Sequence, residues 1–260
     1  MTTESLGTHN FLERRPNEPG SGASVTARTF EILLDQILTF RLKPHEFVSE
    51  KTVSEAVGVS RTPVREALAR LAGLGLIDIY PQRGSRVAPL RVADLEKSQF
   101  LREALELGLV KRAVESPTRQ LLVDKLKAEL AIQETFATIA DDRRFFKSDE
   151  LFHRHIAAHA GLPGIWADIS AAKLHMDRFR ALSFPRLDSM AVVLGQHRRI
   201  VAALDAGDLA ETEEAMRSHL RRIFDVLDEV KARHSQFFEA SDLAPATARP
   251  GAAAMAQEIP

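Results

Sequence analysis

Hydrophobic residues recur with the period of an α-helix along most of this chain, and with the period of a β-strand in one short stretch. The first helical stripe begins at Ser24 and ends before Pro44. A second, shorter stripe begins at Ser49 and stops at Gly58, and glycine commonly follows the last turn of a helix. The pattern therefore predicts two amphipathic helices at the start of the first domain.

A third helix and a hairpin follow directly. The helix begins at Ser60, whose hydroxyl can cap the free amides of the first turn, and it ends at Gly73 or two residues later. Residues 76–80 and 85–88 then alternate between apolar and polar side chains, as two strands joined by a turn do. Three helices and a hairpin in about 65 residues predict a winged helix-turn-helix domain over residues 24–90.

The chain after Arg91 shows only helical signals, with proline and glycine breakers between them. This pattern predicts an all-α bundle of six or seven helices over residues 91–234, so the fold class is mainly α. The polar residues 1–23 and the Ala- and Pro-rich residues 235–260 are expected to be disordered. The expected helices of the bundle cover residues 92–115, 118–140, 142–159, 163–182, 188–206 and 208–233.

The composition excludes several kinds of site. The 260 residues include no cysteine, so disulfides, thiolate catalysis and cysteine-bound zinc are excluded, and any metal must be held by histidine or carboxylate side chains. A single tryptophan and a single tyrosine argue against an aromatic platform for single-stranded nucleic acid. There is no apolar run of about 18 residues, and the N-terminal residues lack the apolar segment of a signal peptide. We therefore expect a cytoplasmic protein with no membrane partner.

Charge alone gives little support for DNA binding. The formal net charge is −1, and residues 24–89 carry nine lysine or arginine residues against seven aspartate or glutamate residues. Exposed arginines on a helix can equally form a solvated face. A DNA-binding function must therefore be argued from the order of the elements and from the positions of particular side chains.

Two arginines lie on one face of the third helix. Arg61 and Arg65 are four residues apart near the N-terminal end of that helix, which in a helix-turn-helix enters the major groove. There an arginine can pair with guanine through two hydrogen bonds, and hydroxyl groups can reach a base or a phosphate. Basic side chains and glycine on the preceding helix and the wing would add contacts to the DNA backbone. The predicted DNA-contacting residues are Lys51, Ser60, Arg61, Thr62, Arg65, Arg83 and Gly84.

The sequence GVSRTPVREALARLAGLGLI, followed by QRGSRV, resembles the DNA-binding domain of the GntR family of bacterial transcription regulators. The resemblance covers residues 24–90 and runs through the turn, the recognition helix and the wing. It implies that these residues meet operator DNA. One departure is visible in the segment between the first two helices, where this chain has Phe40 and His45 at positions that are usually glycine in the family.

Polar side chains also lie on the apolar stripes of three later helices. On the helix of residues 142–159, His153 lies about 40° from Asp149 around the helix axis, among phenylalanine and isoleucine side chains. His197 and His219 are likewise surrounded by apolar neighbours on their own helices. Three buried imidazoles and a carboxylate need buried partners. Either a divalent metal (zinc, nickel, manganese or iron) binds all four residues, or they form a buried polar network.

The predicted bundle resembles the FCD effector domain, which occurs in the FadR-type branch of the GntR family. The metal site of that domain uses an Asp-x-x-x-His helix and two later histidines, which are matched by DELFH and by the helices of His197 and His219. The branch also has Arg-x-x-Leu-Glu on its first helix, matched by Arg102 in LREALE. Arg102 would either grip the carboxylate of an effector or pair with Glu106 on its own helix. Arg178 is a further candidate for effector binding.

Together these features predict a ligand-responsive transcription regulator, and we expect a repressor. A homodimer would bind palindromic operator DNA, and a small carboxylate, hydroxy acid or sugar acid would change the orientation of the DNA-binding domains. The alternative is a metal-dependent enzyme whose N-terminal domain only mediates interactions. Because the apolar stripes carry no second acid or base for metal-assisted hydrolysis, the pattern favours the regulator and predicts no enzymatic activity.

Overall fold

The computed structural model describes residues 24–183 and 187–243, and the chain forms two compact units. The first, here called the winged unit, contains the described residues up to Arg91 together with those from Ser235 onward. The second, here called the helical unit, contains Val92–His234. The expected disordered arm, residues 1–23, and residues 244–260 of the expected tail lie outside the described part of the chain.

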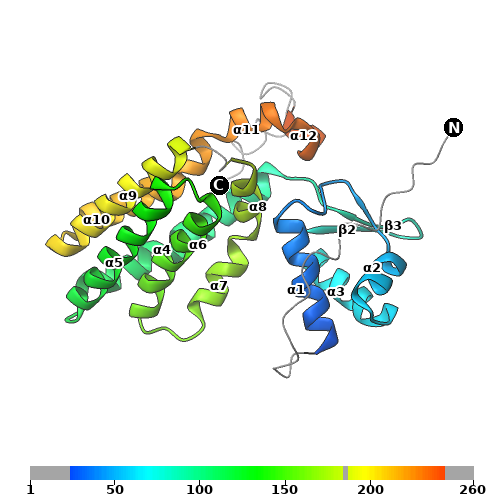
Figure 1. Cartoon of the computed structure of the whole chain (residues 1–260), viewed down its shortest axis with the longest axis horizontal. Helices are drawn as coiled ribbons and strands as arrows, with labels where there is room; N and C mark the ends of the chain where they lie inside the picture. The colour runs from blue at the N-terminus through cyan, green and yellow to red at the C-terminus, as the bar shows by residue number, and fades with distance from the viewer. Residues whose placement is uncertain (1–23, 184–186, 244–260) are drawn as a thin grey trace, which may run out of the picture. The chain divides into compact units, whose positions relative to one another are not determined.

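The described residues of the winged unit up to Arg91 form three helices and a three-stranded antiparallel sheet in the order β1-β3-β2 (Figure 1). The sequence pattern does not predict β1, because two residues are too few to show a period. This strand exists because Phe47 and Val48 pair with Arg86 and Ser85 of β3. The elements are α1 (Val25–Leu38), β1 (Phe47–Val48), α2 (Glu50–Val57), α3 (Arg61–Gly73), β2 (Ile77–Tyr80) and β3 (Gly84–Val87).

Local signals fix the ends of the first two helices. The Ser24 hydroxyl accepts a hydrogen bond from the Ala27 amide, and the Ser49 hydroxyl accepts one from the Thr52 amide. Helix α2 ends at Gly58, whose φ of 73° lies in the left-handed region that glycine adopts without strain. The apolar faces of α1 and α3 then pack together. The buried residues of this contact include Leu33, Ile37, Val64, Leu68 and Leu71.

Phe40 and His45 stand where the family pattern has glycine, and both have positive φ angles, 55° and 68°. Residues with a side chain adopt this region rarely. Tertiary contacts hold both residues here: the ring centroid of Phe40 lies 5.4 Å from that of Phe237, and the His45 amide donates to the Val87 carbonyl. The turns therefore keep the conformation that glycine would take, although the residue types differ.

Residues 235–243, here called the C-terminal segment, correct the prediction that the tail is disordered from residue 235. The Leu90 amide donates to the Phe237 carbonyl at 2.8 Å, and Leu90 forms a parallel bridge with Phe238. The side chain of Phe238 is buried. Phe237 and Phe238 thus hold the C-terminal segment in a fixed conformation. The polar residues around them had suggested disorder. Its short helices are η2 (Ser235–Phe237) and α12 (Ala240–Leu243).

The described residues of the helical unit form helices joined by short turns. Two of the expected helices are each divided: residues 163–182 form two helices that separate at Lys173, and residues 208–233 form two that separate at Val226. The helices are α4 (Val92–Glu115), α5 (Arg119–Thr138), α6 (Asp142–His159), α7 (Ile165–Ala172), α8 (Leu174–Ser183), α9 (Leu187–Ala206), α10 (Leu209–Asp225) and α11 (Leu227–Arg233).

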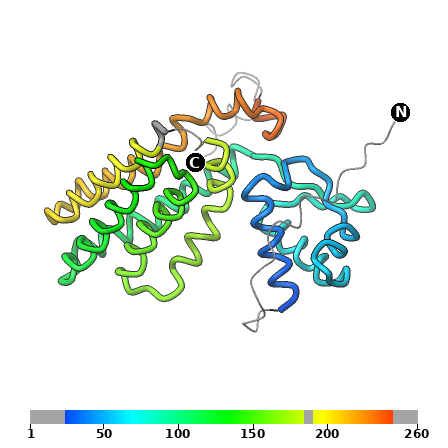
Figure 2. Tube along the Cα trace, in the orientation of Figure 1, coloured from blue at the N-terminus to red at the C-terminus, as the bar shows by residue number. Residues whose placement is uncertain are grey.

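The helices of the helical unit pack around an apolar core. Helix α10 packs against both α4 and α9, and α5 packs against α6 and α9 (Figures 1 and 2). The core between them includes Leu109, Leu126, Phe152, Ile200 and Met216. The three helices that carry the predicted metal ligands therefore contribute to the same core. No helix in the described part of the chain is long and apolar enough to cross a membrane.

Candidate functional site

The predicted DNA-contacting residues are all exposed. They come from α2, from the N-cap and first residues of α3, and from the turn between β2 and β3 with the first residue of β3. Arg61 and Arg65 lie one turn apart on the exposed side of α3, while Val64 and Leu68 on its other side are buried. The structure thus presents cationic and hydroxyl groups at one end of α3, in the arrangement that a helix-turn-helix needs.

Two small residues of this surface have distinct structural roles. Ser60 occupies the N-cap position of α3, but its hydroxyl makes no capping hydrogen bond, which corrects the expectation that it caps the helix. That hydroxyl is therefore not committed to the helix amides. Gly84 in the wing has a φ of 90°, and a Cβ atom at this position would collide with the ring of Phe47. The wing turn consequently requires glycine.

Arg65 already has a partner within the winged unit. Its Nε and Nη2 atoms donate to Oε1 and Oε2 of Glu50 at 3.1 and 3.0 Å. Glu50 is the first residue of α2, so this pair joins the two helices of the helix-turn-helix. The hydrogen bond from Arg65 holds the pKa of Glu50 below its ordinary value, and the carboxylate is therefore ionised at neutral pH. No local sequence pattern marks this acid as a partner of Arg65.

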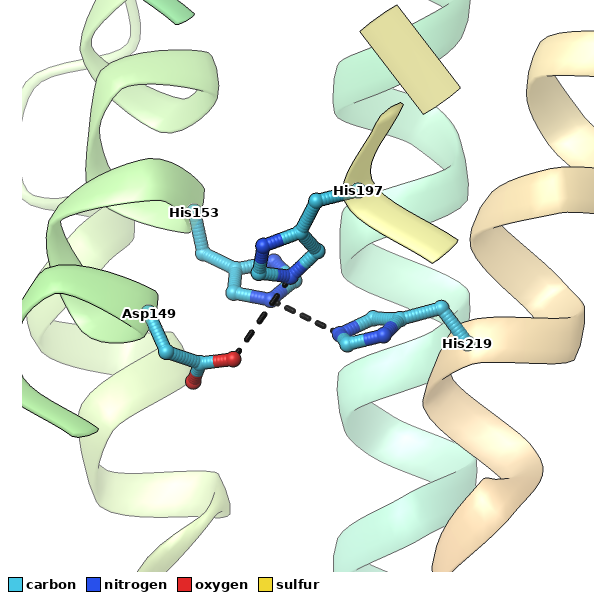
Figure 3. Close-up of side chains that lie close together, drawn as sticks. All are labelled: Asp149, His153, His197 and His219. Atoms are coloured by element: carbon cyan, nitrogen blue, oxygen red, sulfur yellow. Dashed lines mark hydrogen bonds and ion pairs between the residues drawn. The ribbon is translucent and has the colours of Figure 1, made fainter. Parts of the chain in front are cut away.

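Asp149, His153, His197 and His219 come together in the interior of the helical unit (Figure 3). Helix α6 supplies the aspartate and the first histidine, and α9 and α10 supply the other two. All four residues are buried, and one ligand atom from each lies within 4.8 Å of the others. These are the four residues that the sequence predicts as metal ligands.

Each imidazole of this quartet is oriented through its Nδ1 atom by an oxygen of another side chain. The three contacts are His153 Nδ1 with Glu106 Oε2 at 2.5 Å, His197 Nδ1 with Gln133 Oε1 at 2.8 Å, and His219 Nδ1 with Gln196 Oε1 at 3.1 Å. A carboxylate or amide oxygen only accepts hydrogen bonds, so the Nδ1 atom of each ring carries the proton. The lone pair of each neutral ring is therefore on Nε2.

The Nε2 atoms face the other members of the quartet. His153 Nε2 lies 3.1 Å from His219 Nε2, and His197 Nε2 lies 3.5 Å from Asp149 Oδ1. Two lone pairs at such a distance repel unless a proton or a metal cation lies between them. Asp149 Oδ1 and His197 Nε2 are also buried without a hydrogen-bond partner among the described residues. A divalent cation would satisfy all of these atoms together, so the donor set fits a metal.

The electrostatic environment favours the metal-binding forms of these side chains. Burial lowers the pKa of His197 to about 3, which outweighs the attraction of Asp149. Burial also lowers the pKa of His219 well below its ordinary value. For Asp149, burial alone would raise the pKa, but the Arg180 guanidinium holds it below the ordinary range. Two imidazoles are thus neutral and the carboxylate is charged at neutral pH, as metal coordination requires.

Glu106 connects the quartet to a buried arginine. Its Oε1 atom accepts a hydrogen bond from Arg102 Nε at 2.6 Å, while its Oε2 atom contacts His153. Burial would raise the pKa of Glu106, but the charge of Arg102 contributes to lowering it to about 2. Of the two roles considered for Arg102, the structure therefore contains the pair with Glu106.

A small cavity of about 60 Å³ adjoins the quartet, since His219 forms part of its wall. Its wall contains apolar side chains and three arginines, Arg102, Arg180 and Arg222. Arg102 thus pairs with Glu106 and also forms part of the cavity wall. Arg178 is completely buried and is not part of the lining, whereas Arg180 lines the cavity and also donates to Asp149 at 2.9 Å.

The sequence pattern identifies the four candidate ligands but not the residues that orient them. Gln133 carries a usable signal, because it lies on the apolar stripe of α5 that also contains Leu122 and Leu126. Gln196 and Arg180 carry no such signal. Their positions depend on how α8, α9 and α10 pack, which a helical period does not specify.

The chain matches two family models. Residues 26–87 match "Bacterial regulatory proteins, gntR family", and residues 99–222 match "FCD domain". An uncharacterized HTH-type transcriptional regulator in an unstable DNA locus of Streptomyces ambofaciens is 38% identical over 216 residues, which cover 79% of this chain and 86% of that protein. The HTH-type transcriptional repressor RspR of Escherichia coli strain K12 is 34% identical over 218 residues, covering 82% and 93%.

A solved structure of E. coli McbR/YncC has the same fold, with a TM-score of 0.65 at 22% identity, covering 80% of this chain and 98% of that chain. The family and the named relatives are transcription regulators and not enzymes. The alternative of a metal-dependent enzyme is therefore not retained. This chain belongs to the GntR family of bacterial transcription regulators, with a GntR-type helix-turn-helix domain followed by an FCD domain.

Proposed function

We propose that this regulator is a ligand-responsive, metal-containing repressor. A homodimer in the cytoplasm presents two winged units to the half-sites of a palindromic operator, and each helical unit holds a divalent metal and a small carboxylate effector. Effector binding changes the affinity for the operator, because the effector binds the two conformations of the dimer unequally. The name of the relative RspR, a transcriptional repressor, supports the sign of regulation.

The orientation of the three imidazoles is the observation that carries the metal proposal. Each Nδ1 atom is held by an oxygen acceptor, so each Nε2 lone pair is available within the quartet. Such partners commonly fix the tautomer and the ring orientation of metal-bound histidines. Three imidazole nitrogens and one carboxylate suit zinc, nickel, manganese or iron. The metal would be bound by Asp149, His153, His197 and His219, and would supply a positive charge beside the cavity.

The cavity supports a small acidic effector. Its arginines can bind a carboxylate through paired hydrogen bonds, and its contact with His219 places it next to the proposed metal. The volume suits a small carboxylate, hydroxy acid or sugar acid better than a large cofactor. Arg102 remains a proposed effector-binding residue. Arg180 replaces Arg178 in this role, since Arg180 is the one that lines the cavity.

The exposed end of α3 supports recognition of a major groove. We assign base contacts to Arg61 and Arg65, and phosphate or base contacts to the Ser60 and Thr62 hydroxyls. The remaining residues of the surface, Lys51, Arg83 and Gly84, are assigned to the DNA backbone or the minor groove.

Elemental analysis of protein purified without a histidine tag tests the metal. We expect about one metal ion per chain in the wild type, and none in the His153→Ala/His197→Ala double variant. The matched control is His155→Ala/His159→Ala, which removes two histidines of the same part of the chain and should retain the metal. A wild type that stays as empty as the double variant, after dialysis against each of the four candidate metals, would contradict the proposal.

Thermal shifts test the effector. Metal-loaded protein is scanned with a panel of small carboxylates, hydroxy acids and sugar acids, and a binder raises the melting temperature by mass action. The Arg222→Ala variant should keep its metal but lose most of this shift, because Arg222 lines the cavity. If no acid of the panel stabilises the wild type, or if Arg222→Ala responds as the wild type does, the proposed effector site is wrong.

A further inference from the structure

The pair between Glu50 and Arg65 places a carboxylate on the surface proposed to face DNA. The side chains are exposed by 33% for Glu50 and 73% for Arg65. Exposed ion pairs of this kind add little to protein stability. A negative charge at this position also repels the phosphate backbone. The stability of the ion pair and the attraction for DNA therefore do not account for the presence of this acid.

The geometry of the pair leaves part of the guanidinium available. An arginine side chain has five N–H donors, and Glu50 accepts from the one on Nε and from Nη2. The second donor of Nη2 and one donor of Nη1 remain side by side on the end edge of the planar group. Two parallel donors on one edge match the O6 and N7 acceptors of guanine in the major groove. The carboxylate thus contacts one edge of Arg65 and leaves the edge that can read a base.

The position of Glu50 at the start of α2 fixes the place from which its carboxylate holds Arg65. Ser49 caps α2, so Glu50 is the first residue of a helix whose start is fixed by a hydrogen bond. The long Arg65 side chain would otherwise sample many rotamers, and fixing it before DNA binds reduces the entropy that binding costs. An acid in the first turn is also favoured by the helix dipole. The interaction with the dipole does not involve Arg65, so variants of Glu50 in the presence and absence of Arg65 separate it from positioning.

We infer that Glu50 is a positioning residue for base recognition, which holds the Arg65 guanidinium so that its free edge reads a guanine of the operator. This assignment rests on the DNA interface proposed above. Glu50 makes no base contact of its own in this role. Its contribution is to the discrimination between base pairs, and not to the general attraction for DNA.

The test compares Glu50→Asp with Glu55→Asp in the full-length protein. Both substitutions keep the charge and remove one methylene from a solvent-accessible acid of α2, but only the first withdraws the carboxylate from Arg65. High-affinity duplexes are first selected by the wild type from a random pool. Dissociation constants are then measured at one salt concentration for the selected duplex, for duplexes with each G·C pair replaced, and for an unrelated duplex.

We expect Arg65→Ala to reduce discrimination at one G·C pair by roughly 10-fold, and Glu50→Asp to reduce it at the same pair by about 3-fold. The affinity of Glu50→Asp for the unrelated duplex should not change, because the charge is retained. Glu55→Asp should leave both quantities as in the wild type. In the Arg65→Ala background, Glu50→Asp should have no further effect on discrimination, since the group that it positions is gone.

Several outcomes would overturn the inference, and they differ from those that overturn the interface. Full discrimination in Glu50→Asp, or an equal loss in the presence and absence of Arg65, would show that Glu50 does not act through Arg65. If Arg65→Ala itself keeps full discrimination, or if no sequence is selected from the pool, the proposed interface fails instead. Circular dichroism melting curves establish that each variant is folded. The Glu50→Gln variant repeats the test with the length of the side chain kept and its charge removed.

Discussion

The two units of this protein use charged side chains in opposite ways. In the winged unit, the basic residues of the proposed DNA surface are exposed, and the Arg65–Glu50 pair is open to solvent. In the helical unit, Asp149, His153 and His197 are almost completely buried, and each contacts a polar side chain of another helix. One unit thus offers charge to a ligand that arrives from solvent, and the other removes polar groups from water.

The difference shows what each environment demands of its neighbours. An exposed cation is solvated by water, so its neighbours affect the orientation of its side chain more than the stability of the fold. A buried carboxylate or imidazole needs a partner at almost every polar atom, because an unsatisfied atom is costly there. Substitutions in the helical unit should therefore act through loss of a specific partner, and those on the DNA surface through direction and salt-dependent attraction.

The largest effect is expected from the C-terminal segment, which tests whether it belongs to the winged unit. Phe238→Ala should lower the free energy of unfolding of that unit by about 3–5 kcal/mol, because a buried phenylalanine is lost. Trp166 is the single tryptophan and lies in α7, so its fluorescence reports on the helical unit. In urea, the part of the circular dichroism transition that reports on the winged unit should move to lower concentration, while the Trp166 transition stays.

The control is Leu243→Ala in the same segment. Leu243 is exposed by 41%, so its truncation should shift neither transition noticeably. A Phe238→Ala variant whose Trp166 transition moves together with the rest would contradict the assignment of this segment to the winged unit.

A smaller but specific effect is expected at Glu106. Glu106→Gln removes the charged acceptor that orients His153, and loss of such a partner typically weakens metal affinity by about 10- to 100-fold. Competition with a chromogenic chelator measures this affinity. Glu103→Gln on the same helix, where the acid pairs with Arg221 instead, should leave it unchanged. Equal metal affinity in Glu106→Gln and the wild type would show that the contact does not support the metal.

On the exposed side of the comparison, Arg61→Ala should reduce the ratio of operator affinity to non-specific affinity by about 10-fold, the scale of one lost bidentate base contact. Arg70→Ala removes an exposed arginine near the other end of α3, over the Phe30 ring, and should leave this ratio intact. Metal content should be that of the wild type in both variants. Both affinities are measured by fluorescence anisotropy on labelled duplexes. A ratio that Arg61→Ala leaves unchanged would remove this residue from the proposed interface.

The smallest effect is expected at Lys51, assigned to a phosphate. Lys51→Ala should weaken binding to all duplexes alike and reduce the slope of log affinity against log salt by about 1. Titrations at several salt concentrations give this slope. Metal affinity, by contrast, should change little with salt, because the quartet is buried and poorly screened. A sequence-dependent loss in Lys51→Ala would instead indicate that Lys51 contacts a base.

Local sequence signals predict much of the architecture. The helical period, the caps at Ser24 and Ser49 and the left-handed stop at Gly58 predict the first helices, because each signal acts within a few residues. The same period places Asp149 and His153 on one apolar face. The sequence by itself therefore determined the mainly α fold, the helix-turn-helix and the four polar residues that must find partners inside the bundle.

Tertiary structure decided which groups those partners are. Glu106 and Gln133 meet His153 and His197 across 47 and 64 residues of sequence, and no local pattern specifies such contacts. The same holds for Arg180 in place of Arg178 at the cavity, because both arginines lie on α8 and the packing of that helix sets which of them lines it. Periodicity fixes the face of a helix on which a residue lies. Only the packing of helices fixes the atom that it meets.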